Sequence, residues 1–175
     1  MKKGDIFMRK NKGFSLVELI IVIAIMAILV GIMVPVLMHF IEKSNVSSDY
    51  QLADTIRSAV AYSIVDARVK EDDASQPFLE YMEDPTANPG GSTLINGKNM
   101  IKITDINDPD CVLLESLEEY TGCSLGSLKN QIRSKHESDT ECYVCTTNGV
   151  VTIALFHTDS TGRKKPDEGR DIIVQ

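Results

Sequence analysis

The sequence predicts an α+β protein in which one long N-terminal α-helix, half transmembrane and half amphipathic, packs on a small antiparallel β-sheet. Three observations support this fold class. Residues 19–40 form an unbroken apolar run, apolar residues between positions 46 and 67 recur at helical spacing, and Asn-Gly pairs at 96–97 and 148–149 separate strand-like segments. A chain of 175 residues is long enough for one small globular domain beyond such a helix.

The apolar run contains no Asp, Glu, Lys or Arg. Its 22 residues extend about 33 Å as a helix, which is enough to cross the roughly 30 Å hydrocarbon core of a bilayer. We therefore predict a transmembrane helix. Glu18 stands at its head, and a carboxylate at the end of a membrane segment usually marks function.

Charge is distributed unevenly about this helix. Residues 1–13 hold five Lys and Arg against one Asp, a net charge of +4, which leaves −11 for the rest of a chain whose formal charge is −7. Positive charge before the helix predicts a cytoplasmic N-terminus and an exported C-terminal part. The acidic exterior has no basic surface for phosphate groups, so direct nucleic-acid binding is not expected.

The stretch KGFSLVE, from Lys12 to Glu18, followed by the apolar run with Pro35 inside it, resembles the N-terminus of the type IV pilin family, pseudopilins included. A secretory signal peptide has a shorter apolar core and is cut after it, whereas here the matching cut site precedes the run. The resemblance implies that a prepilin peptidase cleaves between Gly13 and Phe14 and that Phe14 becomes the N-methylated first residue. The alternative is an uncleaved signal anchor with Glu18 as an ordinary interfacial residue.

On this resemblance residues 1–13 are a prepilin leader peptide, 14–40 a transmembrane and assembly helix, 41–70 its amphipathic continuation, and 71–175 a globular domain. The expected function is that of a structural subunit of an extracellular type IV pilus, for adhesion, surface motility or aggregation, made as a precursor in the cell membrane. The expected partners are prepilin peptidase, other pilin copies, the inner-membrane assembly platform with its ATPase motor, and the lipid bilayer. The alternatives are a minor pilin or pseudopilin of a secretion or DNA-uptake system, and an anchored domain that never polymerises.

Glu18 is the residue that we expect to carry subunit assembly. In a dry filament core a lone carboxylate is costly or takes up a proton unless a cation meets it. The cation available in this region is the α-ammonium that cleavage frees on Phe14. Within one rigid helix that ammonium lies about 6 Å away along the axis, so we expect the partner to be the ammonium of an adjacent subunit.

Two residues weaken the apolar helix locally. Pro35 removes a backbone hydrogen bond, at a cost of about 3 kcal/mol, and Gly31 loosens the same turn. They form either a tolerated membrane-helix kink or, as we favour, a segment that loosens when the subunit leaves the bilayer.

Beyond Phe40 the apolar residues predict one face of a helix that extends to about Lys70 and packs on the domain. This face consists of Val46, Tyr50, Ala53, Ile56, Val60, Ile64 and Ala67. A weaker stripe either contacts neighbouring subunits or belongs to the core; it consists of Leu52, Ala59, Tyr62 and Val65.

Residues 71–91 are rich in Pro, Gly and Asp and predict a surface loop, with one short helical turn capped by Ser75 and Pro77. That turn carries Phe78, Leu79, Tyr81 and Met82 back onto the domain. Residues 125–135 are ambiguous between a second short helix and irregular structure.

A strand is predicted at residues 100–106, after the Asn-Gly turn at 96–97. A short helix then runs from an Asp108 N-cap to Gly122, with Val112, Leu113, Leu117 and Tyr120 on one side. The oxygen-bearing side chains between the two elements are those of Asp105, Asn107, Asp108 and Asp110. They suggest a calcium loop, but because the twelve-residue pattern with its glycine and closing glutamate is missing, capping is the preferred interpretation.

The clearest strands are residues 141–147 and 150–157, joined by Asn148-Gly149. A two-residue turn places on one apolar side Cys142, Val144, Thr146, Val151, Ile153 and Leu155. The other side carries Glu141, Tyr143, Cys145 and Thr152. Residues 171–175 suggest a last strand.

No catalytic pattern emerges from the sequence. His39, His136 and His157 lack a partner pattern that would make one of them a base, and no Gly-rich phosphate loop is present. We therefore expect no enzyme activity, no cofactor and no metal site.

Four cysteines in an exported domain suggest disulfides. In a strand Cys142 and Cys145 point to opposite faces and cannot bond each other, and a helix at 110–120 separates Cys111 from Cys123 by about 18 Å. The crossed pairings remain, 111–142 with 123–145 or 111–145 with 123–142. Four free thiols are the alternative.

Overall fold

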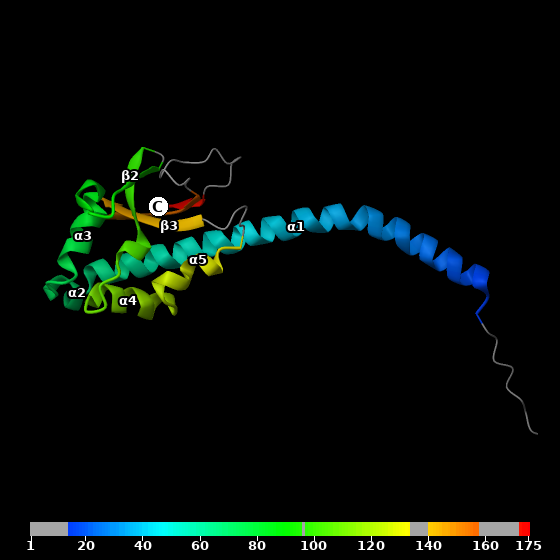
Figure 1. Cartoon of the computed structure of the whole chain (residues 1–175), viewed down its shortest axis with the longest axis horizontal. Helices are drawn as coiled ribbons and strands as arrows, with labels where there is room; N and C mark the ends of the chain where they lie inside the picture. Colours follow the sequence, from blue (N-terminus) through cyan, green and yellow to red (C-terminus); the bar gives the residue numbers. More distant parts are fainter. Residues whose placement is uncertain (1–13, 96, 134–139, 158–171) are drawn as a thin grey trace, which may run out of the picture. The chain divides into compact units, whose positions relative to one another are not determined.

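A computed structural model of the chain describes residues 14–95, 97–133, 140–157 and 172–175. The chain divides into two compact units, Met1–Ile41 and Glu42–Gln175 (Figure 1). Helix α1 (Leu16–Val65) contributes its first part to one unit and its second part to the other. The predicted leader peptide, residues 1–13, lies outside the described residues.

In the N-terminal unit every side chain from Phe14 to Ile41 is exposed. Among the described residues, α1 is the one helix long and apolar enough to cross a membrane. The helix is continuous through Gly31 and Pro35, and a Cβ added at Gly31 would meet open space. The apolar run is thus helical although its side chains are exposed, and backbone hydrogen bonds within the helix satisfy its peptide groups.

In the C-terminal unit the second half of α1 packs on the domain through the predicted face. Ala53, Ile56 and Val60 are buried, which confirms the center of that face, and Ala59 from the weaker stripe joins them. Tyr50 and Ala67 are exposed, so the prediction was wrong at the ends of the face.

Helix α1 also ends earlier than predicted, at Val65. The Asp66 carboxylate accepts a hydrogen bond from the amide of Arg68 and caps a separate short helix, α2 (Ala67–Glu71). An aspartate at an N-cap position competes with helix continuation, and this explains the break.

The segment predicted as a surface loop is largely helical. Helix α3 (Gln76–Glu83) and the 3₁₀ turn η1 (Pro85–Ala87) occupy most of it, and Met82 is completely buried. Proline disrupts a helix where its missing N–H would have donated a hydrogen bond to a carbonyl of the preceding turn. Pro77 lies in the first turn, where that amide has no partner within the helix.

Five antiparallel strands form one sheet in the order β1-β2-β3-β4-β5. They are β1 (Thr93–Ile95), β2 (Lys98–Lys102), β3 (Thr140–Thr147), β4 (Val150–His157) and β5 (Ile172–Val174). The predicted β3–β4 hairpin is confirmed, with Asn148 and Gly149 both at positive φ (52° and 77°) and with Val144 opposite Ile153. Gly97, between β1 and β2, also has positive φ, and Asn96 lies outside the described residues.

The strand predicted at residues 100–106 ends at Lys102, and a 3₁₀ turn, η2 (Ile103–Asp105), follows. In a strand Ile103 and Ile106 would point to opposite faces. The 3₁₀ turn places residues three apart on one side, so both isoleucines are buried in the same core.

Helix α4 (Val112–Thr121) begins four residues after Asp108, the predicted N-cap, and Gly122 ends it in the left-handed conformation as expected. Tyr120 was predicted on the same side of this helix as Leu113 and Leu117; those two are buried, whereas Tyr120 is exposed. The ambiguous stretch that follows is helical, as η3 (Leu125–Ser127) and α5 (Leu128–Gln131).

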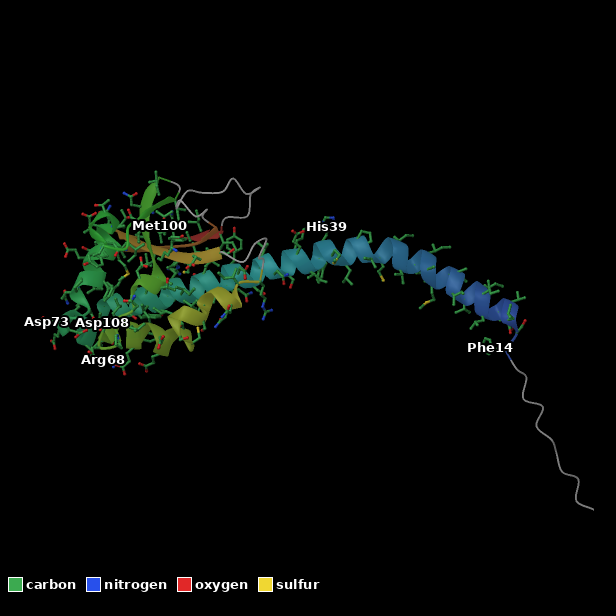
Figure 2. All side chains as sticks on the ribbon, viewed as in Figure 1. Phe14, His39, Arg68, Asp73, Met100 and Asp108 are labelled. Atoms are coloured by element: carbon green, nitrogen blue, oxygen red, sulfur yellow. The ribbon has the colours of Figure 1, made fainter. Side chains whose placement is uncertain are left out.

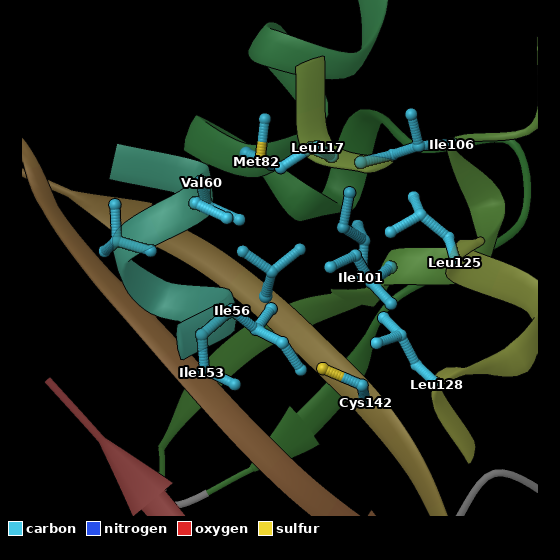
Figure 3. Packing of buried hydrophobic residues seen from close by; sticks show 14 of the residues in the cluster. Ile56, Val60, Met82, Ile101, Ile106, Leu117, Leu125, Leu128, Cys142 and Ile153 are labelled. Atoms are coloured by element: carbon cyan, nitrogen blue, oxygen red, sulfur yellow. The ribbon is translucent and has the colours of Figure 1, made fainter. Parts of the chain in front are cut away.

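The main core joins α1, the inner face of the sheet and the short helices, and Figure 3 shows Ile56, Ile153 and Leu128 meeting within it. A second cluster, with Met100, Tyr143 and Cys145, covers the other face of the sheet. The strand side predicted to be the less apolar one is thus also buried, because β1, β2 and β5 add apolar side chains to it.

Candidate assembly site

The site begins at the N-terminus of α1. The amide of Ser15 donates a hydrogen bond of 2.9 Å to Oε2 of Glu18, and the amide of Leu19 donates to the Ser15 carbonyl at 3.2 Å. Ser15 is thus the residue just before the helix, and Glu18 reaches back to it as in a capping box. A carboxylate in the first turn also interacts favourably with the helix dipole.

This arrangement corrects our geometric argument about Glu18. Phe14 and Ser15 precede the helix, which begins at Leu16, so the helical rise of about 6 Å does not separate the Phe14 nitrogen from Glu18. The geometry therefore allows the Phe14 ammonium and the Glu18 carboxylate of the same chain to form an ion pair. The Ser-x-x-Glu spacing at 15–18 was visible in the sequence and is the signal that indicates the cap.

The Glu18 carboxylate retains capacity beyond the cap. An ionised carboxylate offers two oxygens and about four acceptor positions. The hydrogen bond from Ser15 uses Oε2, and within the described residues no hydrogen bond or ion pair engages Oε1. One side chain can therefore hold the start of the helix and accept a cation as well.

The apolar surface beside Glu18 is continuous. Side chains project from all sides of α1 between the labelled Phe14 and His39 (Figure 2), and Phe14 itself is 83% exposed. Apolar patches of this extent on a single chain mark a membrane or protein contact. Lipid tails or the same helix from other copies would both cover it.

The cysteines are all free in the structure, so neither crossed pairing is formed. Cys111 and Cys123 lie in or against the main core, whereas Cys145 belongs to the cluster on the other face of the sheet. Each crossed pairing needs a bond from Cys145 through the sheet, which geometry forbids. The opposite orientation of Cys142 and Cys145 is confirmed.

Burial also makes two of these thiols unreactive. It raises the pKa of Cys142 to about 12, with the nearby Glu141 charge adding to the effect. Burial likewise raises the pKa of Cys145. Both are neutral thiols at physiological pH and unsuited to nucleophilic or metal chemistry.

The N-terminus of α4 is capped by two side chains that are distant in the sequence. The Asp72 carboxylate accepts from the amide of Val112 at 3.0 Å, and the Ser75 hydroxyl accepts from the amide of Leu113 at 3.0 Å. The hydrogen bond from Ser75, followed by that from Val112, holds the pKa of Asp72 below its ordinary value. Asp108, the predicted N-cap, instead accepts from the amide of Asp110 in a local turn.

Sequence reasoning missed two buried polar groups on α1. Asp49 is completely buried and accepts a hydrogen bond of 2.8 Å from the amide of Arg133. The hydroxyls of Ser63 and Ser116 share a hydrogen bond of 2.8 Å in the core. Asp49 and Ser63 continue the spacing of three and four residues that the buried apolar face of α1 follows. That spacing was the signal in the sequence that could have identified them as buried.

The described histidines and the acidic side chains between 105 and 110 do not form a metal-ligand group. In the part of the chain that the structure describes, no three His, Cys, Asp or Glu side chains gather as metal ligands. His39 lies on exposed α1 and His157 ends β4, while His136 lies outside the described residues.

Comparison with known proteins agrees with this geometry. The prokaryotic N-terminal methylation motif matches residues 8–34. A fimbrial protein of Pseudomonas aeruginosa is 25% identical over 142 residues, covering 80% of this chain and 90% of the relative. The type IV major fimbrial protein FimA of Dichelobacter nodosus is 36% identical over 65 residues, or 37% of this chain and 41% of the relative. No solved structure matches the chain.

The N-terminal helix has an exposed apolar first part and a second part that packs on a small antiparallel sheet. These features define a class of α+β proteins whose helix is long and apolar enough to cross a membrane. The methylation motif and the fimbrial relatives narrow that class. Both findings make the chain similar to type IV pilins.

Proposed function

We propose that the chain is a structural, non-enzymatic building block of an extracellular pilus, made as a precursor in the inner membrane with its N-terminus in the cytoplasm. Prepilin peptidase cleaves after Gly13, and Phe14 is methylated. The observation that carries the proposal is the position of the capping carboxylate of Glu18, which lies within the methylation motif and at the head of an exposed apolar helix.

The exposed helix supplies the driving force for assembly. In the precursor, lipid covers the apolar surface of residues 14–41. In a filament, helices from neighbouring subunits replace the lipid, and dispersion contacts between closely packed helices favour the exchange. Gly31 and Pro35 reduce the cost of adjusting the helix during this transfer.

Glu18 selects processed subunits. The cleaved Phe14 ammonium, from an adjacent subunit or from the same chain, meets the Glu18 carboxylate through the oxygen that the cap leaves available. Leaving that carboxylate unpaired among apolar helices would cost several kcal/mol. An uncut chain carries no ammonium at Phe14, so it cannot complete the pair.

The pilus role is that of a major subunit, acting in adhesion, surface motility or aggregation. Relatives named as fimbrial and type IV major fimbrial proteins support this choice over a minor pilin or pseudopilin. Extension of the filament requires the inner-membrane platform and its ATPase motor, since this chain shows no phosphate-binding loop.

Mass spectrometry of sheared surface filaments tests the proposal. The expected result is an abundant chain that begins with N-methylated Phe14. A Gly13→Val variant, which blocks cleavage but keeps Glu18, should remain in the membrane as the uncut chain. Mature chains that begin at Met1, or that are cut after the apolar run, would contradict the proposal.

A further inference from the structure

A pocket of about 430 Å³ opens on the C-terminal unit between α3 and the loops that contain residues 88–90 and 105–108. Its volume falls within the range of small-molecule sites. The pocket has an aromatic wall on α3 and a polar wall on the two loops. Filament assembly, as proposed above, makes no use of it.

The aromatic wall consists of Phe78 and Tyr81. Their rings pack edge to face, with centroids 6.1 Å apart and an interplanar angle of 89°. Both side chains are partly buried against the main core, which fixes the rings in place. Aromatic rings attract cations because their faces carry partial negative charge.

The polar wall carries two carboxylates, and within the described part of the chain only one oxygen of each accepts a hydrogen bond from the protein. Asp105 accepts at Oδ2 from the Asn88 amide at 3.0 Å, and Asp108 accepts at Oδ1 from the amide of Asp110 at 3.0 Å. Within the described residues the other oxygen of each carboxylate has no protein partner. Among the residues that the structure describes, no Lys, Arg or His lines the pocket.

The wall is rigid as well as acidic. Asn88 is 8% exposed and is held by the Gly91 carbonyl and the Gly90 amide. A Cβ at Gly90 would lie 3.1 Å from Oδ2 of Asp105, so the loop approaches as closely as glycine allows. The carboxylate of Asp105 is thus positioned before any ligand arrives.

We propose that this pocket binds an organic cation, an alkylguanidinium or alkylammonium group such as the end of an arginine or lysine side chain. Two carboxylates in a pocket that no described Lys, Arg or His lines repel anions, and a neutral ligand would bury them without compensation. A planar guanidinium can donate to the carboxylates while it lies against an aromatic ring. The inference does not depend on the proposed filament function.

Isothermal titration calorimetry on the full-length chain in detergent micelles at 0.15 M NaCl tests the proposal. The probes are doubly blocked arginine, agmatine and doubly blocked citrulline, which is the neutral analogue of arginine. Blocked arginine should bind with a Kd of about 1 mM, as expected for a ligand of its size, while citrulline should bind at least about tenfold more weakly. Stronger binding of blocked arginine than of agmatine would indicate a protein side chain as the natural ligand, and the reverse a free polyamine.

Matched variants locate the binding. Asp108→Asn keeps the acceptor for the Asp110 amide but removes the charge, and should raise the Kd of arginine about five- to tenfold. Asp105→Asn should act in the same direction. The control Asp110→Asn makes the same charge change in the same loop but outside the pocket, and should shift the Kd less than about twofold. Equal effects of the Asp108 and Asp110 variants, equal binding of citrulline, or no saturable binding would each overturn the proposal.

Discussion

Replacing Glu18 by glutamine separates the two roles that the structure gives this residue. Glutamine can replace glutamate in a capping box, so Glu18→Gln keeps an acceptor for the Ser15 amide but removes the negative charge. Glu18→Ala removes both. The cap is worth about 0.5–2 kcal/mol of helix stability, which a long membrane helix can lose without unfolding.

The loss of charge is expected to matter more. In the filament Glu18→Gln leaves the Phe14 ammonium without its partner among apolar helices, at a cost of about 3–5 kcal/mol for each subunit. Since about 1.4 kcal/mol corresponds to a factor of ten, subunit addition should weaken by at least about a hundredfold. Membrane insertion and cleavage after Gly13 should continue, because neither depends on that ion pair.

The assay compares pilin in sheared filaments with total membrane pilin by immunoblot, with the mass of the membrane form as a check on processing. We expect processed but unassembled protein from both variants. Filament yield at the wild-type level from Glu18→Gln, together with loss of filaments from Glu18→Ala, would show that capping and not charge matters. A wild-type yield from both would refute a role of Glu18 in assembly.

Three further predictions concern the C-terminal unit. Ile153→Ala, at a completely buried position, should lower the free energy of unfolding by about 2–5 kcal/mol in denaturant titrations. The hydrogen bond from Ser75 lowers the pKa of Asp72, so the stabilisation that Asp72 provides should be complete above its unfolded pKa of about 4 and should be lost as pH falls through its lower folded pKa; Asp72→Asn should flatten this acid limb, and an unchanged limb would contradict the reasoning. Buried Cys142, with its pKa raised to about 12, should resist iodoacetamide at pH 8 in the folded chain while partly exposed Cys123 reacts, as peptide mass spectrometry can check.

Much of the architecture follows from local physical chemistry and was predictable. The length of the apolar run predicts a helix long enough to cross a membrane, and the positive φ that Asn148 and Gly149 tolerate determines the β3–β4 hairpin and its register. The capping box of Ser15 and Glu18 is equally local, since its two residues are three positions apart.

Other features were decided only by tertiary structure. The amide of Val112 is capped by Asp72 from 40 positions away, and no local pattern can favour that residue over nearby Asp108. Strand β2 ends before Ile103 because Ile103 and Ile106 are buried in the same core. Cys145 is separated from Cys111 because the sheet lies between the two clusters that contain them. In each case the group contacts segments that are distant in the sequence. The pattern of neighbouring residues does not indicate which distant segments those are.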